Sequence, residues 1–387
     1  MSVIKEQPVI PLFKVAMAEE ARSMVSDVVA SGWVGEGPVV AEFEDRLQRR
    51  LGTPHLVTVN SATSGLHLAL HMTAGPGRPT HKDEPEGVGE VLTTAMTCTA
   101  TNWPILANGL RVRWVDIDPT TLNIDLDDLA AKITPSTRAI VVVHWAGSPL
   151  ELDRLSTILD EAEARHGVRP TVIEDCAHAW GATYDGSPLG THGNIAVYSF
   201  QAIKHLTTGD GGAIVFPNAE LTERARLLRW YGIDRRLPEA TRLATDIGEY
   251  GFKFHMNDIC ATIGLANLTD VDTRIARHQD NAAFYDRELK GVTGLETLTT
   301  PVGGRSACWL YTVLVERRTD FETHMAGAGI ATSPVHRRND LYSVVADSRA
   351  PLPGLDSVAD RMVSIPVGWW VSETDREHIV ETIRKGW

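Results

Sequence analysis

The chain has 387 residues, of which 43% are hydrophobic and 22% charged, as in a soluble globular protein large enough for two domains. A formal net charge of −13 argues against nucleic acid as a partner, although it permits a local basic pocket for a phosphate. The sequence shows no apolar run long enough for a membrane helix and no apolar signal core, so we expect a cytoplasmic protein without a membrane partner.

Apolar runs typical of strands alternate with helical patterns through the first two-thirds of the chain. The predicted strands are Leu56–Val59, Glu90–Thr93, Val112–Val115, Ala139–Val143, Thr171–Ile173, Ile195–Phe200 and Ala213–Phe216. The predicted helices between them are Ser64–Met72, Thr99–Ala107, Leu126–Lys132 and Leu152–Arg165. This alternation predicts an α/β fold with a mostly parallel sheet flanked by helices, which binds ligands at the carboxyl ends of its strands.

The pattern changes near Asp234. A helix over Leu221–Tyr231 is followed by a polar loop that runs to Gly248. Further helices are predicted over Asn257–Leu268, Ile275–Leu289 and Thr374–Arg384, with a strand over Leu310–Val315. We therefore expect a large domain over residues 1–245 and a smaller α+β domain over residues 246–387. Residues 74–89, rich in proline, glycine and acids, are expected to form an exposed loop.

The four cysteines, Cys98, Cys176, Cys260 and Cys308, are far apart in the sequence. No CxxC pair is present, so neither a zinc site nor a disulfide framework is expected. We predict free thiols and no bound metal.

The segment from Ser199 to Gly212 carries one lysine between two apolar runs. Both runs are predicted to be buried strands, and the glycines of the linker allow a sharp turn. Lys204 is therefore expected near the rim of the sheet, where burial lowers the pKa of an amine and prepares it for Schiff-base chemistry. The alternative is a lysine whose stem lies on the core and whose charge reaches water.

Small polar residues follow the first predicted strand and open a helix: Asn60, Ser61, Ala62, Thr63 and Ser64. The first N–H groups of a helix are unpaired and its dipole favours an anion, so this segment is a candidate phosphate site. The alternative is helix capping by Ser61 or Thr63.

Two acids, Glu174 and Asp175, follow the predicted strand Thr171–Ile173. Asp175 is expected where a ligand of the sheet would bind, and Glu174 on the opposite side. A carboxylate beside a pyridine nitrogen keeps that nitrogen protonated, so that the ring can accept electrons from a carbanion. The alternative for Asp175 is an N-cap or a strand-end salt bridge.

A phosphate site, a pyridinium partner and an amine together predict pyridoxal 5′-phosphate as the cofactor. A further aromatic and basic stretch over residues 249–258, EYGFKFHMND, precedes a predicted helix. An ordinary loop with core aromatics is the alternative for that stretch.

Several blocks of the sequence carry a resemblance to a known family. They are SGWVGEGPVVAEFE (31–44), NSATSGLHLAL (60–70), VDIDPTTLNID (115–125), IEDCAHAWGATYDG (173–186), SFQAIKHLTTGDGG (199–212) and GFKFHMNDICATIGLANL (251–268). In these blocks, their order and their spacing, the chain from about Ile10 onward resembles the DegT-type sugar aminotransferases. That family consists of fold-type I enzymes that depend on pyridoxal 5′-phosphate, so the resemblance implies their mixed, mostly parallel sheet.

The resemblance implies roles for individual residues. Lys204 would form the Schiff base with the cofactor and later move the proton, and Asp175 would pair with the pyridine nitrogen. His178 would approach the ring hydroxyl, and Ala177 would pack on one face of the ring. The cofactor phosphate would be held by Ala62, Thr63 and Ser199.

In the family, a residue of the 251–256 block reaches the phosphate of the partner subunit, which implies a homodimer with shared active sites. This chain departs from the family at four positions, one of which is Tyr231, where the family often has histidine. Lys253 replaces the more frequent asparagine and would bind phosphate as a point charge. Ala62 replaces a glycine, so its φ angle must be negative. Cys98 stands where an aromatic often stacks on the ring, so either a neighbour such as Trp145 substitutes or the alignment shifts here.

The resemblance implies a transaminase. L-glutamate would convert the cofactor to pyridoxamine 5′-phosphate, and a nucleotide-linked deoxysugar with a 4-keto-6-deoxy or 3-keto group would then receive the amine. Two alternatives keep the same fold, namely a pyridoxamine-phosphate-dependent sugar 3-dehydratase and a cyclitol-ketone aminotransferase. Such dehydratases carry histidine at the Schiff-base position, so Lys204 favours transamination. A non-catalytic regulator is a further alternative, against which the acidic charge and the Lys204–Asp175 pair argue.

Three residues are predicted to contact the substrate: Trp33, Arg229 and His336. A nucleotide diphosphate needs basic partners such as Arg229, and His336 lies where the small domain of the family approaches the active site. The alternatives are a solvated surface arginine, a core tryptophan and a core or capping histidine.

Overall fold

The protein is described by a computed structural model that covers residues 9–76 and 89–387. Its centre is a seven-stranded sheet with the strand order β1-β9-β8-β5-β4-β2-β3. The strands are β1 (Leu56–Val59), β2 (Glu90–Thr94), β3 (Arg111–Val115), β4 (Thr137–Val143), β5 (Thr171–Asp175), β8 (Ile195–Ser199) and β9 (Gly212–Val215). Neighbours from β3 to β8 are parallel, whereas β9 is antiparallel to both β8 and β1. The predicted mostly parallel sheet is therefore confirmed.

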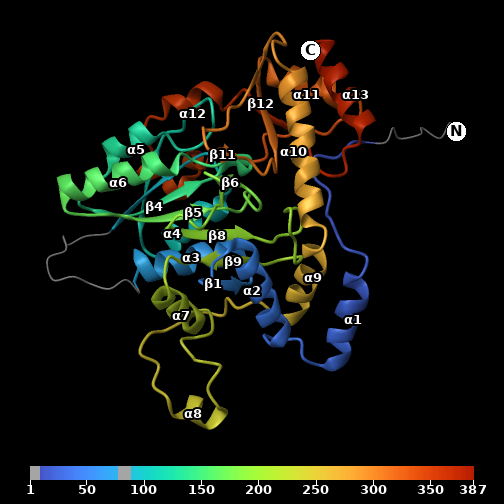
Figure 1. Cartoon of the computed structure of the whole chain (residues 1–387). Coiled ribbons are helices and arrows are strands. Elements are labelled where there is room, and N and C mark those ends of the chain that lie inside the picture. Colours follow the sequence, from blue (N-terminus) through green and yellow to red (C-terminus); the bar gives the residue numbers. More distant parts are fainter. Residues whose placement is uncertain (1–8, 77–88) are drawn as a thin grey trace.

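Helices cover both faces of this sheet (Figure 1). The alternation of side chains along β4 shows how: Ile140 and Val142 belong to one hydrophobic cluster, and Ala139 and Val141 to the other. The first cluster includes residues of α2 (Pro38–Leu51), α5 (Leu126–Lys132) and α6 (Leu152–His166). The second includes residues of α3 (Ala62–Thr73), α4 (Thr99–Ala107) and α7 (Ala219–Leu228).

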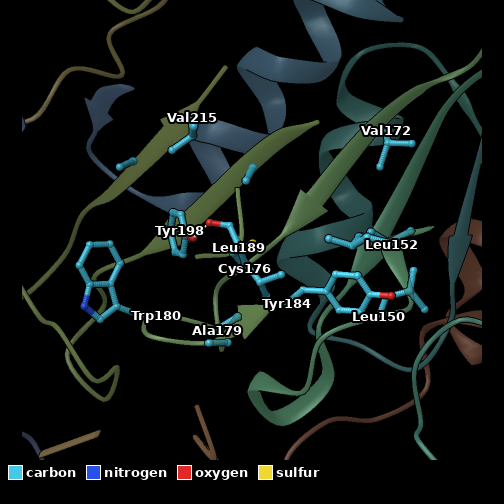
Figure 2. Packing of buried hydrophobic residues seen from close by; sticks show 14 of the residues in the cluster. Leu150, Leu152, Val172, Cys176, Ala179, Trp180, Tyr184, Leu189, Tyr198 and Val215 are labelled. Carbon is cyan, nitrogen blue, oxygen red and sulfur yellow. Dashed lines mark hydrogen bonds between the residues drawn. The ribbon is translucent and has the colours of Figure 1, made fainter. Parts of the chain in front are cut away.

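The loop that follows β5 is anchored in the first cluster. Figure 2 shows Cys176 and Trp180 of this loop among Tyr198 and Leu189. The hydroxyl of Tyr198, which lies on the neighbouring strand β8, donates a hydrogen bond to the carbonyl oxygen of Leu189. The position of the loop after Asp175 is therefore fixed by close packing beneath it.

The C-terminal part is built around a second, three-stranded sheet with its own hydrophobic cluster. Its strands are β10 (Leu295–Thr297), β12 (Tyr311–Val315) and β13 (Met362–Ile365). The helices that contribute to this cluster are α10 (Val271–Glu288), α11 (Arg318–Gly327) and α13 (Glu373–Arg384). The helices α9 (Asp258–Leu268) and α12 (Pro353–Val358) pack instead in the clusters of the large sheet. Figure 1 shows α10 running alongside the large sheet toward the small one. A smaller α+β part is thus confirmed, while its boundary at residues 245–246 stays a prediction.

A third small sheet, β11-β6-β7, joins the segment after β5 to the C-terminal part. Its strands are β6 (Thr183–Tyr184), β7 (Ser187–Pro188) and β11 (Gly304–Arg305).

Four further helices of the described chain were not predicted from the sequence: α1 (Ala21–Ser31), α2, α11 and α12. The expected polar loop before residue 248 also contains the short helix α8 (Glu239–Ala244), which has no buried residue and lies at the tip of an excursion (Figure 1). Most of the loop expected over residues 74–89 lies outside the described residues. No helix among the described residues is both long and apolar enough to span a bilayer.

Candidate active site

A cavity of about 400 Å³ lies at the carboxyl ends of β5 and β8. Nine of the predicted residues line it: Ala62, Thr63, Cys98, Asp175, Ala177, His178, Ser199, Lys204 and His336. A larger hollow of about 600 Å³ lies at the opposite edge, near the amino ends of the same strands, and none of the predicted residues line it. Because ligands of such sheets bind at the carboxyl edge, the smaller cavity is the candidate active site.

Asp175 is the last residue of β5, and its carboxylate is buried in this cavity. Oδ2 accepts a hydrogen bond of 2.7 Å from the hydroxyl of Thr101, and Oδ1 one of 3.0 Å from the backbone N–H of Ala177. Burial raises the pKa of Asp175, while the two hydrogen bonds and the charge of Lys204 oppose this rise. The carboxylate therefore has neutral hydrogen-bond donors but no cationic N–H beside it within the described chain.

Glu174 points to the other side of the sheet, as predicted. Its Oε2 lies 2.9 Å from Nε2 of His144, and its Oε1 accepts a hydrogen bond of 2.8 Å from the amide of Asn194. Because Nδ1 of His144 accepts the N–H of Leu150, Nε2 carries the proton that is donated to Glu174. This buried pair lies next to the Cys176 thiol, on the side of the sheet opposite to the cavity.

Lys204 lies in the turn between β8 and β9, with its amine in the cavity. Nζ lies 3.4 Å from the centroid of the Trp309 ring. Burial lowers the pKa of Lys204 to about 7, and the negative charge of Asp175 opposes this shift. The predicted effect of burial on this amine is thus present, and part of the amine is neutral near pH 7.

The N-terminus of α3 faces the same cavity. Ser61 caps the helix by accepting the N–H of Ser64 at 3.1 Å, so the capping role proposed for Ser61 is confirmed. The N–H groups of Ala62 and Thr63 precede the first helical hydrogen bond and can bind an anion. Ala62 has no positive φ angle, which is the condition its methyl group requires.

Glycine 212 brings β9 close to this helix start. A Cβ atom at Gly212 would lie 2.8 Å from the backbone nitrogen of Ala62 and 2.6 Å from the carbonyl oxygen of Tyr198. No real side chain fits such a gap, so the glycine is what allows the Lys204 turn to return beside the candidate phosphate site.

Two histidines in the cavity have buried nitrogen atoms without a hydrogen-bond partner, Nδ1 of His178 and Nε2 of His336. Their rings are nearly parallel, with centroids 5.8 Å apart. Burial lowers the pKa of His178 well below its ordinary value and that of His336 to about 4, so both imidazoles are neutral. An unsatisfied buried nitrogen is costly, which favours a ligand that supplies the missing partner.

Three predicted site residues lie outside this cavity. In place of the expected substrate contact, Arg229 is buried in ion pairs with Glu44 at 2.5 Å and Glu36 at 2.7 Å. Trp33 is 73% exposed in the loop before α2. Lys253 is exposed, and its carbonyl oxygen accepts a hydrogen bond from the Asn60 side chain.

The aromatic that faces the amine is not the expected one. Trp145, proposed as a substitute for the aromatic missing at Cys98, is fully buried and contacts His178 only edge-on, at 6.2 Å. Its indole N–H donates to the hydroxyl of Thr312 instead of facing the cavity. Trp309 and Phe13 line the cavity in its place.

Sequence reasoning missed Thr101, Phe13 and Trp309. A signal for Thr101 exists, because it lies in the first turn of α4, the predicted helix that follows the carboxyl end of β2, beside the hydroxyl of Thr97 in the loop before that helix. The positions of Phe13 and Trp309 depend on contacts between distant segments, and neither residue lies in one of the family-like blocks.

Comparison with known proteins shows the family to which a chain with this cavity belongs. A family model described as the DegT/DnrJ/EryC1/StrS aminotransferase family matches residues 15–384. The chain belongs to this family. It is therefore an aminotransferase, and its cofactor is pyridoxal 5′-phosphate.

Solved structures agree over the whole fold. AtS13 from Actinomadura melliaura is 56% identical, with a TM-score of 0.94 over 99% of this chain and 100% of the other. The sugar aminotransferase CalS13 from Micromonospora echinospora is 55% identical, with a TM-score of 0.93 over 98% and 100%. Spr1654 from Streptococcus pneumoniae, 27% identical over 97% of this chain and 98% of the other with a TM-score of 0.86, is known in a PLP form.

Among curated relatives, the UDP-4-amino-4-deoxy-L-arabinose–oxoglutarate aminotransferase of Shewanella sediminis is 35% identical. The alignment covers 78% of this chain and 74% of that enzyme.

The residues in the cavity fit the cofactor. The buried carboxylate of Asp175 lacks a cationic N–H that the pyridine ring would supply, and Nδ1 of His178 lacks a partner. The start of α3 offers N–H groups to a phosphate, and Lys204 offers an amine. These four features line one cavity, as a single elongated ligand requires.

Proposed function

We propose that the enzyme transfers the amino group of L-glutamate to the keto group of a nucleotide-linked deoxysugar, either a 4-keto-6-deoxy or a 3-keto sugar. The observation that carries the proposal is that Lys204 and Asp175 line one buried cavity. The names of two relatives support the substrate class. CalS13 is named a sugar aminotransferase, and the Shewanella enzyme is named for a UDP-linked amino sugar and for oxoglutarate, the keto acid of glutamate.

When bound, pyridoxal 5′-phosphate supplies the electron sink that makes the loss of a C–H proton feasible. The residues of the chain then hold and move protons. Neutral Lys204 accepts the proton from the donor carbon and returns it, for which a pKa of about 7 is well suited. Asp175 keeps the ring nitrogen protonated, and the N–H groups of Ala62 and Thr63 with the hydroxyl of Ser199 bind the phosphate.

Of the predicted substrate residues, His336 keeps its proposed role, because its unpartnered Nε2 lies in the cavity wall. A neutral imidazole can donate a hydrogen bond to a sugar hydroxyl or carbonyl oxygen, or accept one from a sugar hydroxyl group. His336→Gln should preserve part of this contact and His336→Leu should remove it. The KM for the keto sugar should therefore rise more in the leucine variant, with the KM for glutamate unchanged.

The decisive experiment is a mass-spectrometric product assay. Purified enzyme is incubated with ¹⁵N-labelled L-glutamate and a panel of dTDP-, UDP- and GDP-linked keto sugars and cyclitol ketones, and Lys204→Ala serves as the matched control. An amino sugar carrying ¹⁵N supports the proposal. A deoxygenated keto sugar would instead indicate the 3-dehydratase. Labelled product from cyclitol ketones alone would show that the amino acceptor is a cyclitol ketone and not a nucleotide-linked sugar. No labelled product from any compound of the panel would overturn the proposed substrate class.

We further propose a homodimer in which Lys253 binds the cofactor phosphate of the partner subunit. Support comes from its exposure and from its place outside the cavity of its own chain. Lys204→Ala and Lys253→Ala chains, each impaired alone, are mixed after denaturation and refolding. A heterodimer then holds one intact site, so activity should return. If Lys253 acted within its own chain, mixing would restore nothing.

A further inference from the structure

Trp309 lines the candidate active site and contacts several of its residues, although it has no role in the proposed reaction. It lies just before β12, is 3% exposed, and its backbone N–H donates to the carbonyl oxygen of Ala146 at 2.8 Å. Its ring stacks on His178, with centroids 3.9 Å apart and planes 22° apart, and on Phe13 at 5.3 Å. The indole is thus held in one orientation by its backbone and by two rings.

The same indole contacts the Lys204 turn twice. Nζ of Lys204 lies 3.4 Å from the ring centroid, within the range of a cation–π contact. The indole N–H donates a hydrogen bond of 3.0 Å to the carbonyl oxygen of Ile203, the residue directly before the lysine. One side chain therefore fixes both the backbone that carries the lysine and the end of its side chain.

The other groups that face the amine leave it without an ion pair. Among the residues that the structure describes, none forms a salt bridge with Lys204, although the charges of Asp175 and Cys98 favour its protonated form. The imidazoles of His178, His205 and His336 are kept neutral by burial, which lowers the pKa of each. The negative face of the Trp309 ring is therefore the nearest group that stabilises an ammonium at this position.

We propose that Trp309 is a positioning residue that holds the amine of Lys204 whenever the amine is not bonded to the cofactor, and that it stabilises the protonated form there. The inference rests on the role proposed for Lys204 but not on the identity of the sugar. In each half-reaction the lysine must leave the cofactor, remain within reach and return. A rigid aromatic surface beside the cavity gives the freed amine a defined place, and it balances the burial that favours the neutral form.

The test measures the protonation of Lys204 directly, in full-length enzyme stripped of cofactor. An amine-reactive reagent is applied across a range of pH, and mass spectrometry follows labelling at Lys204 with exposed Lys290 as the internal reference. Tryptophan 309 is replaced site-specifically by mono- to tetrafluorotryptophan, which weakens the π face while nearly preserving shape. The same tetrafluoro residue at Trp103, which packs on Tyr342 outside the cavity, is the matched control.

The labelling midpoint of Lys204 should fall stepwise with fluorine number, by roughly half a pH unit to one unit in total. Below the midpoint this corresponds to about three- to tenfold faster labelling. The Trp103 control should leave the midpoint unchanged. A midpoint that stays constant along the fluorinated series would overturn the proposal, whatever the product assay shows with sugars.

Two substitutions separate the ring from its hydrogen bond. Trp309→Phe keeps an aromatic face but loses the N–H donor to Ile203, whereas Trp309→Leu loses both. The leucine variant should show the lowered midpoint and the phenylalanine variant most of the wild-type value. If both shift equally, the contact with Ile203 and not the aromatic face controls the amine, and the cation–π part of the proposal is rejected. Thermal unfolding checks both variants, and the fluorinated series stands if either fails to fold.

Discussion

Two buried clusters of ionisable residues in this molecule differ in whether each group has a partner within the chain. In one, Arg229 pairs with Glu44 and Glu36, and Arg226 adds a second contact to Glu44 at 2.9 Å. Burial by itself would raise the pKa of Glu44, but the two guanidinium groups lower it to about 2. Every charge in this cluster has a partner, so the charged forms are the stable ones and no ligand is needed.

In the other cluster, at the carboxyl edge of the sheet, burial dominates. It lowers the pKa of Lys204 to about 7, raises that of Asp175, and leaves His178 and His336 neutral with unpartnered nitrogens. Buried ionisable groups thus stabilise the fold where their partners are present in the chain. Where the partners are missing, their pKa values are shifted and they are available to bind a ligand or transfer a proton. We call the cluster around Arg229 and Glu44 the closed cluster, and the cluster around Lys204 and Asp175, whose partners are missing, the open cluster. The open cluster is the one proposed to bind the cofactor.

The largest expected effect comes from Lys204→Ala in the open cluster. The variant should show no borohydride-reducible bond to the cofactor, and turnover should fall by at least about 10²–10⁴-fold, the usual contribution of proton transfer by a positioned group. Absorbance and steady-state turnover measure the two effects. Lys290→Ala, at an exposed helix-end position, is the control and should match the wild type. Normal turnover in Lys204→Ala would defeat the assignment of the active site.

In the closed cluster, Glu44→Gln should lower the free energy of unfolding and leave the turnover of the folded enzyme nearly unchanged. It removes the carboxylate that Arg229 and Arg226 share, so that only Glu36 remains paired with the buried Arg229, and breaking a buried ion pair typically costs about 3–5 kcal/mol. Urea unfolding measures this loss, while turnover per folded molecule should stay near the wild-type value. The matched control is Glu42→Gln, whose exposed pair with Arg46 should change stability by less than about 1 kcal/mol. Equal effects of the two variants would contradict the contrast between the clusters.

The sequence predicted the open cluster better than the closed one, for a physical reason. Asp175, Lys204 and the start of α3 follow strands whose apolar runs are local signals, and α4 and α5 have the predicted bounds. Arg229 meets Glu44 across 185 residues and Trp309 meets Ile203 across 106. Contacts of that span depend on how whole elements pack, which no local pattern records, so Arg229 was assigned to substrate and Trp309 was not singled out.

The closed cluster should also control acid unfolding. Because the pKa of Glu44 in the folded state is depressed, the stability it contributes is fully present above its ordinary value near 4.5 and is lost as the pH falls toward about 2. The stability difference between wild type and Glu44→Gln should therefore shrink across that window. Urea midpoints measured at several pH values between the two limits test this, and a difference independent of pH would show that Glu44 is not the group that titrates.

The smallest effect is expected at Thr101, which acts on the cofactor only through Asp175. Its hydroxyl donates to Asp175 and itself lies 2.8 Å from the hydroxyl of Thr97, so the proton order runs from Thr97 through Thr101 to the carboxylate. Thr101→Val removes one hydrogen bond to a charged group, which is worth about 1.5–3 kcal/mol. It should raise the pKa of Asp175 further and so weaken the hold on a protonated pyridine nitrogen.

We therefore expect Thr101→Val to weaken cofactor binding by roughly ten- to a hundredfold, and Thr101→Ser, which keeps the hydroxyl, to stay within about threefold of wild type. Equilibrium titration of stripped enzyme with pyridoxal 5′-phosphate measures both. Weakening that is greater at high pH than at low pH would contradict the proposed cause, because the missing hydrogen bond matters most where Asp175 is only partly ionised. Since Thr101 has no direct role in proton transfer, turnover at saturating cofactor should fall much less than affinity, which distinguishes support of Asp175 from a contribution of Lys204.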